Sequence, residues 1–175
     1  MKLALCAGSF LEDIRKKRIT LEEVLRLAGE YAFPAVEIRE DLLGEKAKEL
    51  PQIRVLAEKL NIELVYASKI WPLNNDVAKM EKAASNILVG IEDTCLLGAD
   101  TYKIGFGPVI SLCDLEEKQY SVFNSIVESA EKRKVTVCLE NANRELGGRP
   151  NLLREFLQRV DSAYIKTCFD SGNFA

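Results

Sequence analysis

The chain has 175 residues, of which 47% are apolar and 29% charged, and its formal net charge is −3. This apolar fraction is typical of a globular domain and excludes a disordered chain, and we expect a single domain over residues 1–175. The 27 acidic residues outnumber the 24 basic ones, which argues against a nucleic-acid-binding protein. No apolar run approaches the roughly 18 residues that cross a membrane, so we expect no membrane partner.

The chain contains no histidine, which excludes Ser-His-Asp triads, Cys-His pairs and His-ligated zinc sites within it. Its five cysteines are odd in number and form no C-x-x-C. This pattern argues against a disulfide scaffold or a zinc knuckle and favours the reducing cytoplasm. Cys6, Cys138 and Cys168 lie in apolar runs, where we expect them to pack as small hydrophobic side chains.

Short apolar runs typical of strands alternate with longer stretches that have helical spacing. Thr20 and Glu23 form a capping box at the start of the first helix, and Asp114 and Glu117 form a similar pattern further on. Gly98 is a typical residue to follow a helix C-terminus. In chain order the expected elements are strand 3–7, helix 20–31, strand 35–39, helix 49–60, strand 63–68, helix 75–97, strand 101–106, helix 114–133, strand 135–140, helix 151–160 and strand 164–170.

This alternation predicts an α/β protein with a parallel sheet and helical crossovers. The nearly continuous apolar run over 135–139 further predicts strands that are covered on both faces. Two architectures fit: an open doubly wound sheet, or an incomplete (β/α)8 TIM barrel. At about 32 residues per unit, eight units would need about the 250 residues of a complete barrel, so the chain holds about six of eight.

The ends of the strands favour the incomplete barrel. No Gly-rich phosphate loop follows the first strand, as an open nucleotide-binding sheet would require. In a barrel, the carboxyl ends of the strands meet at one mouth, where active sites lie. Polar residues stand at most of these ends: Glu37, Arg39, Ser68, Lys103, Glu140 and Asp170.

Two of these residues end otherwise apolar strands, Glu140 in the fifth and Asp170 in the sixth. Neighbouring strands lie about 4.8 Å apart, so both carboxylates could reach one cation. Ligands that are all oxygen favour Mg²⁺ or Mn²⁺ over zinc. The alternative is that each acid only caps the segment that follows it.

Three stretches, 33–39, 139–141 and 169–173, resemble the second, fifth and sixth strand motifs of the xylose-isomerase-like TIM-barrel superfamily of sugar-phosphate isomerases and epimerases. The resemblance implies that Glu140 and Asp170 bind a divalent metal and that Glu140 is also a catalytic acid/base. It implies that Glu37 and Asn173 contact the substrate, and Glu145 resembles a further substrate-contacting acid at an offset of one residue.

Two other residues near strand ends are expected to contact a sugar. Trp71 could cover a sugar face, or it could pack at the rim. Lys103 ends the fourth strand and could instead be a salt-bridged lysine. The expected partner is therefore a small-molecule carbohydrate.

One departure from the family pattern is large. Family members complete the metal site with a His and a Glu from strands seven and eight, whereas this chain ends at Ala175. Two expectations follow: the chain is a fragment or truncated product of a longer enzyme, for which inactivity of the chain by itself is one possible outcome, or it recruits the missing strands from another copy. Unpaired edges at the first and sixth strands favour homo-oligomers.

The expected function is that of a sugar or sugar-phosphate isomerase or epimerase, which uses a divalent metal to transfer a proton next to a carbonyl. The alternative is a non-catalytic α/β fragment that self-associates. An apurinic-endonuclease-like enzyme on the same fold is disfavoured, because such relatives need histidines and phosphate contacts.

Overall fold

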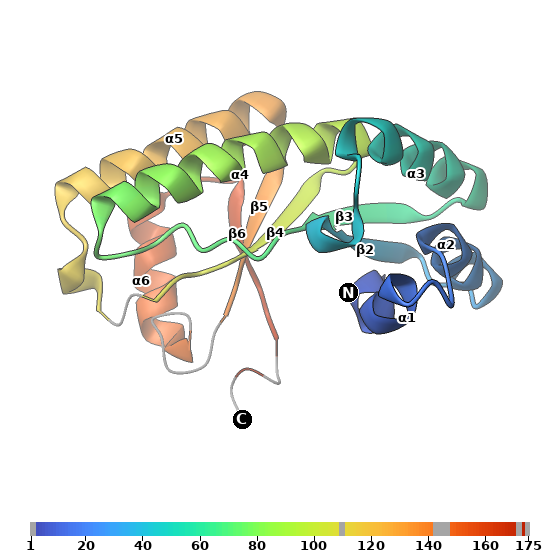
Figure 1. The fold of residues 1–175 in the computed structure, drawn as a ribbon. Coiled ribbons are helices and arrows are strands. Elements are labelled where there is room, and N and C mark those ends of the chain that lie inside the picture. The colour runs from blue at the N-terminus through green and yellow to red at the C-terminus, as the bar shows by residue number, and fades with distance from the viewer. Residues whose placement is uncertain (1–2, 109–110, 142–147, 171–172, 174–175) are drawn as a thin grey trace.

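The computed structural model describes residues 3–108, 111–141, 148–170 and 173 (Figure 1). Six strands alternate with helices as the sequence predicts. The strands are β1 (Ala4–Cys6), β2 (Ala35–Arg39), β3 (Glu63–Ala67), β4 (Thr101–Gly105), β5 (Thr136–Glu140) and β6 (Ile165–Cys168). The α-helices are α1 (Leu11–Arg15), α2 (Leu21–Glu30), α3 (Lys46–Leu60), α4 (Val77–Leu97), α5 (Glu117–Arg133) and α6 (Pro150–Val160), and the 3-10 turns are η1 (Ala7–Phe10), η2 (Glu40–Leu42) and η3 (Leu112–Asp114).

The sheet is parallel throughout, and its strands follow each other in the order β1-β2-β3-β4-β5-β6. A doubly wound sheet would reverse its order at a switch point, and the described strands contain no such reversal. Crossovers of one hand that always advance to the next strand put every helix on the same side. Figure 1 shows this arrangement as an arc of helices around the sheet, from α2 over α3, α4 and α5 to α6. The fold is part of a TIM barrel, and the open-sheet alternative is excluded.

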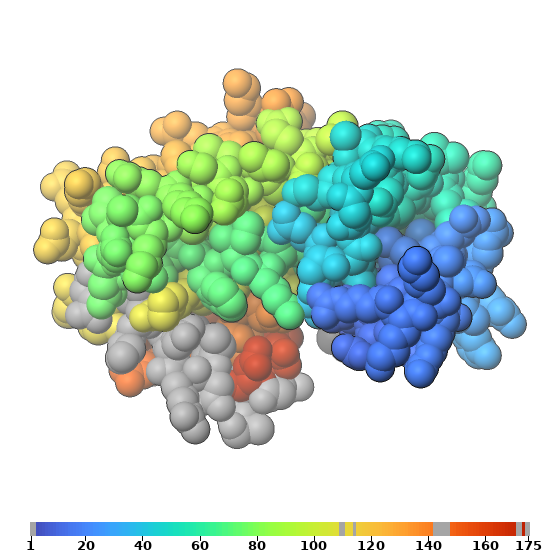
Figure 2. All heavy atoms as spheres, viewed as in Figure 1, coloured from blue at the N-terminus to red at the C-terminus, as the bar shows by residue number. Residues whose placement is uncertain are grey.

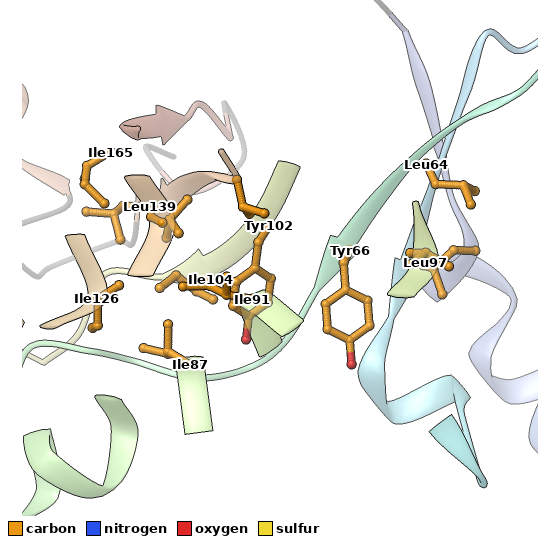
Figure 3. Close-up of a cluster of buried hydrophobic side chains, with 14 of the residues drawn as sticks. Leu64, Tyr66, Ile87, Ile91, Leu97, Tyr102, Ile104, Ile126, Leu139 and Ile165 are labelled. Atoms are coloured by element: carbon orange, nitrogen blue, oxygen red, sulfur yellow. The ribbon is translucent and has the colours of Figure 1, made fainter. Parts of the chain in front are cut away.

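The hydrophobic core lies between the outer face of the sheet and these helices (Figure 3). Alternate strand residues point into it, because side chains in a strand alternate between faces. Tyr66 of β3 and Tyr102 of β4 are fully buried there and stack with ring centroids 5.5 Å apart. Ile87 and Ile91 of α4 are fully buried in the same cluster (Figure 3).

The inner face of the sheet has a different character, and here the expectation that both faces are covered is wrong. Cys138 and Glu140 of β5 are only partly buried, whereas Val137 and Leu139 between them are fully buried. Among the described residues the inner face is partly accessible: Cys138 and Glu140 are partly exposed there, whereas Ala67 is buried. In Figure 2 the blue N-terminal elements and the red end of the described chain stand apart along the lower edge of the molecule.

The cysteines also differ from the expectation of core packing. All five are free, as their odd number and spacing predict. Cys6, Cys138 and Cys168, however, are half-buried and alternate with the core-facing residues of their strands, so they lie on the inner face.

Element boundaries differ from the sequence prediction at a few places. The capping box of α5 uses Glu116 and Gln119, because η3 occupies the stretch at Asp114 where the helix was expected to begin. Helix α3 begins at Lys46 rather than at residue 49, with Pro51 inside its first turns. The predicted capping box at Thr20 and the helix end at Gly98 are confirmed. No helix in the described ranges is long and apolar enough to cross a membrane.

Candidate functional site

A lysine joins two carboxylates on the inner face. Lys103 of β4 places its Nζ 2.9 Å from Glu37 Oε2 of β2 and 3.0 Å from Glu140 Oε1 of β5. The Lys103 and Glu37 side chains are 19% and 13% exposed, and Glu140 is 29% exposed. The structure thus brings together three residues that the sequence named separately, from three different strands.

The charges in this cluster support one another. Burial alone would lower the pKa of the Lys103 ammonium, but hydrogen bonds to Glu37 and Glu140 and their negative charges outweigh burial and raise it. The Cys6 thiol donates to the other oxygen of Glu37, with Sγ 3.2 Å from Oε1. Burial and then the charge of Glu37 raise the pKa of this thiol, which keeps Cys6 protonated as a donor.

The cluster forms one wall of a pocket of about 290 Å³ at the carboxyl ends of β2, β3 and β4. Arg39 also lines this pocket and makes two hydrogen bonds to Asp41, one of them from Nε to Oδ1 at 3.0 Å. A Cβ on Gly8 would lie 2.5 Å from Arg39 Cδ, so glycine at this position leaves room for the arginine. The pocket holds both signs of charge, and its other lining residues are Glu40, Ala67, Ser68 and Lys69.

The single tryptophan of the chain lies beside this cluster. Trp71 is 54% exposed, and a Cβ on Gly105 would lie 2.3 Å from its Cδ1. Gly105 is the register partner of Glu140 on the neighbouring strand. The indole therefore lies over the end of β4, next to the strand position that carries the predicted catalytic carboxylate.

Two close approaches of the chain explain the glycines Gly105 and Gly107. Gly105 leaves space for the Trp71 indole, and its N–H donates to the Ile70 carbonyl at 2.9 Å. A Cβ on Gly107, at φ +128°, would lie 2.1 Å from the Leu73 carbonyl oxygen. Both glycines hold the segment after β3 against the end of β4.

Asn141 connects the ends of β5 and β6, a role that the sequence analysis missed. Its side chain is buried and makes two hydrogen bonds with the backbone of Asp170: Oδ1 accepts from the N–H at 2.6 Å, and Nδ2 donates to the carbonyl at 2.9 Å. Asn173 Nδ2 donates to the Asn141 carbonyl at 2.8 Å. The Asn173 amide thus has a structural partner, and its contact with substrate stays a prediction.

Glu140 and Asp170 are expected on the same face of the sheet. Glu140 is in register with Cys168, the last residue of β6, and Asp170 lies two residues beyond it, so the position of its side chain beside Glu140 stays a prediction. The remaining predicted substrate residue, Glu145, lies outside the described residues.

The described residues fit a divalent metal only in part. Glu140 and Asp170 are oxygen ligands of the type that hard cations prefer. One oxygen of Glu140 already accepts from the Lys103 ammonium at 3.0 Å. Among the described residues, no group of three or more His, Cys, Asp or Glu side chains could hold a metal ion.

Comparisons with known proteins identify the family and the fold. The sequence profile of the xylose isomerase-like TIM barrel family matches residues 25–175. The chain is similar in structure to a D-tagatose 3-epimerase-like protein, with TM-score 0.75, 21% identity, and 99% of this chain and 66% of that chain covered. It is also similar to the IolI protein with a bound zinc atom, with TM-score 0.78, 18% identity, and 99% and 64% covered.

A third similar structure is D-psicose 3-epimerase in the presence of D-fructose, with TM-score 0.72, 15% identity, and 97% of this chain and 63% of that chain covered. The chain thus spans 63–66% of the length of these three structures. No curated protein sequence matches it. From the profile match, supported by the order and direction of its strands, the chain belongs to the xylose isomerase-like TIM-barrel family.

Proposed function

We propose that this chain carries the sugar-binding inner face of an isomerase or epimerase that moves a proton next to a sugar carbonyl. The observation that carries the proposal is the ion cluster of Glu37, Lys103 and Glu140 on the accessible inner face, with the exposed Trp71 beside it. Carboxylates transfer protons, and an ammonium stabilises negative charge on oxygen. An aromatic ring offers an apolar face to a sugar ring.

In the proposed reaction, Glu140 acts as the acid/base. Its second oxygen, Oε2, takes a proton from the carbon next to the carbonyl, and the electrons of the broken C–H bond form an enediolate with negative charge on oxygen. The Lys103 ammonium lies 3.0 Å from Glu140, and in the transition state it donates a hydrogen bond to the negatively charged oxygen of the sugar. Delivery of a proton to the other face of the carbon by a second acid gives an epimer, and return of the proton by Glu140 to the neighbouring carbon, with a proton moved between the two oxygens, gives an isomer.

Glu37 positions the lysine in this scheme. It accepts from Lys103 at 2.9 Å and from the Cys6 thiol at 3.2 Å, so both of its oxygens are engaged by the protein. A carboxylate held in this way is poorly placed to take a proton from substrate. We therefore assign the proton transfer to Glu140 and the orientation of Lys103 to Glu37.

The family resemblance predicts in addition that Glu140 and Asp170 bind Mg²⁺ or Mn²⁺. A bound divalent ion would polarise the carbonyl and hydroxyl oxygens of the sugar. Because the described residues supply two carboxylates for it and Lys103 engages one of them, no step above depends on a metal.

Solvent deuterium tests the proposal, because proton transfer through a carboxylate exchanges the substrate hydrogen with water. The protein is incubated in D₂O with D-fructose, D-tagatose or their phosphates, with and without added Mn²⁺, and deuterium next to the carbonyl is measured by NMR. We expect incorporation with at least one of these sugars and at least about a hundredfold loss in Glu140→Gln. Glu81→Gln, an exposed change on α4, serves as the control and should exchange as the unchanged protein does.

Absence of exchange in every arm contradicts the proposal. It would favour the alternative of a non-catalytic domain that associates with other copies. Equal exchange in Glu140→Gln and the unchanged protein would contradict the assignment of the acid/base.

A further inference from the structure

The Lys103 ammonium stands where a bound cation would stand between two carboxylates. Its Nζ is 2.9 Å from Glu37 and 3.0 Å from Glu140, and the two glutamates come from strands on either side of β4. Each of the bonded carboxylate oxygens is within 3.0 Å of the same nitrogen, so they are at most about 6 Å apart. The chain therefore supplies its own positive charge at the centre of the inner face.

This arrangement conflicts with a simple metal site at Glu140. A divalent ion that binds Glu140 meets an ammonium within hydrogen-bonding distance of the same carboxylate. The two positive charges repel each other strongly at such distances in a partly buried site. Lys103 is 19% exposed, so water screens this repulsion less than it would at the surface.

We propose that Lys103 is the resident cation of this site and that its removal turns Glu37 and Glu140 into a binding site for a divalent cation such as Mn²⁺. Carboxylate ligands lie about 2.0–2.6 Å from Mg²⁺ or Ca²⁺. The two carboxylate oxygens now lie 2.9 and 3.0 Å from the Lys103 nitrogen. If a metal ion took the place of that nitrogen, each oxygen would have to move toward the ion by about 1 Å or less, and water would complete the coordination. The inference goes beyond the proposed reaction and does not depend on it, because binding is measured without sugar.

The proposal is tested by measuring the binding of Mn²⁺ in the absence of sugar. Calorimetry gives the affinity, and electron paramagnetic resonance gives the concentration of the free ion. We expect Lys103→Met to bind Mn²⁺ at least about tenfold more tightly than the unchanged chain. The double variant with Glu37→Gln should lose this gain, since one of the two carboxylates is then neutral. Lys69→Met removes the same charge from the same pocket at a 67% exposed side chain, and we expect less than a twofold change, or about 0.4 kcal/mol.

Two results would overturn the proposal. One is unchanged Mn²⁺ affinity in folded Lys103→Met. The other is a gain that survives Glu37→Gln, which would place the ion between Glu140 and Asp170. Lys103→Gln repeats the experiment with a side chain that can still donate to a carboxylate, should the methionine variant fold poorly.

A measurement on the unchanged chain needs no variant. NMR of the lysine ammonium groups should show a slowly exchanging Lys103 signal that Mg²⁺ at millimolar concentration leaves in place. Loss of that signal on addition of Mg²⁺ would show that the metal displaces the lysine, and it would contradict the proposal.

Discussion

The chain contains two lysines that each join two carboxylates, one on either side of the sheet. On the outer side, Lys46 Nζ lies 2.8 Å from Glu40 Oε1 and 2.7 Å from Asp93 Oδ2, and the same Asp93 oxygen accepts from the Tyr66 hydroxyl at 3.2 Å. Asp93 is 7% exposed and joins α4 to β3 and to the start of α3. Every partner of this cluster belongs to a packed element of the outer layer or to the turn that follows β2.

On the inner side, Lys103 has the same ion geometry with different surroundings. Glu37 and Glu140 line a pocket, and Trp71 lies half exposed beside them. The two ion clusters thus differ in their surroundings: Asp93 of the outer cluster is buried, and only Glu40 of that cluster lines the pocket, whereas Glu37, Lys103 and Glu140 of the inner cluster all line it. The comparison predicts that changes at the outer cluster reduce stability, whereas changes at the inner cluster reduce chemistry.

Alkaline pH should produce the largest effect, and it should act on the outer layer. Burial, together with the charge of Asp93, raises the pKa of Tyr66, and burial raises the pKa of Tyr102. Unfolded tyrosines ionise near pH 10. The stability that these neutral tyrosines provide is therefore complete below about pH 10 and falls as the pH rises above it.

Parallel titrations of tyrosinate absorbance and circular dichroism check this expectation. A late rise in absorbance should coincide with loss of the helical signal. Ionisation of all five tyrosines in a chain that stays folded would break the proposed role of the outer layer.

Gly90→Ala should destabilise the outer layer by about 2 kcal/mol, since overpacking outweighs the better helix propensity of alanine. A Cβ at Gly90 would lie 2.2 Å from the hydroxyl of the fully buried Tyr102. That hydroxyl also shares a 2.5 Å hydrogen bond with Ser68, which the shift would disturb. Urea unfolding measures the change, and a loss below about 0.5 kcal/mol would contradict tight packing at this contact.

Asp93→Asn should lower the free energy of unfolding by about 1.5 kcal/mol. The substitution removes the negative charge of the buried side chain and keeps one oxygen that can accept a hydrogen bond. Lys46 and Tyr66 both donate to the affected oxygen. Equilibrium unfolding of Asp93→Asn beside Glu37→Gln sharpens the comparison. A larger loss at Glu37 than at Asp93 would reverse the assignment of structural and chemical clusters.

Gly105→Ala should have the smallest effect on stability, about 0.5 kcal/mol or less, because the Trp71 indole above it is half exposed and can move. Since Trp71 is the one tryptophan, its fluorescence reports the move directly. We expect a red shift of the emission in Gly105→Ala and a weaker response to added sugar. An unchanged spectrum would contradict the contact between Trp71 and Gly105.

Much of the fold could be predicted from the sequence because local patterns determine it. The alternation of apolar strands and amphipathic helices predicted all six strands, and the capping box at Thr20 and the helix end at Gly98 follow from neighbouring residues alone. The capping box of α5 was misplaced because Asp114 has the right spacing but lies in a 3-10 turn. Short-range patterns could not show that the inner face of the sheet stays accessible.

The site was predictable as a set of strand ends and not as a set of contacts. Polar residues that interrupt apolar strands indicated Glu37, Lys103 and Glu140, but their pairing depends on the curvature of three separate strands. The buried Asn141 was passed over, although it follows Glu140 directly, because a hydrogen-bonding role with the backbone of Asp170 leaves no mark in the sequence.

The most direct test of the account compares Lys103→Met with Lys46→Met in one experiment, since the two lysines share an ion geometry and differ in surroundings. Deuterium exchange into the ketose and the free energy of unfolding are measured for both variants. We predict that Lys103→Met loses exchange even when it is expressed per folded molecule, whereas Lys46→Met loses stability and keeps its exchange per folded molecule. Equal losses of exchange per folded molecule in the two variants would contradict this difference between the two lysines.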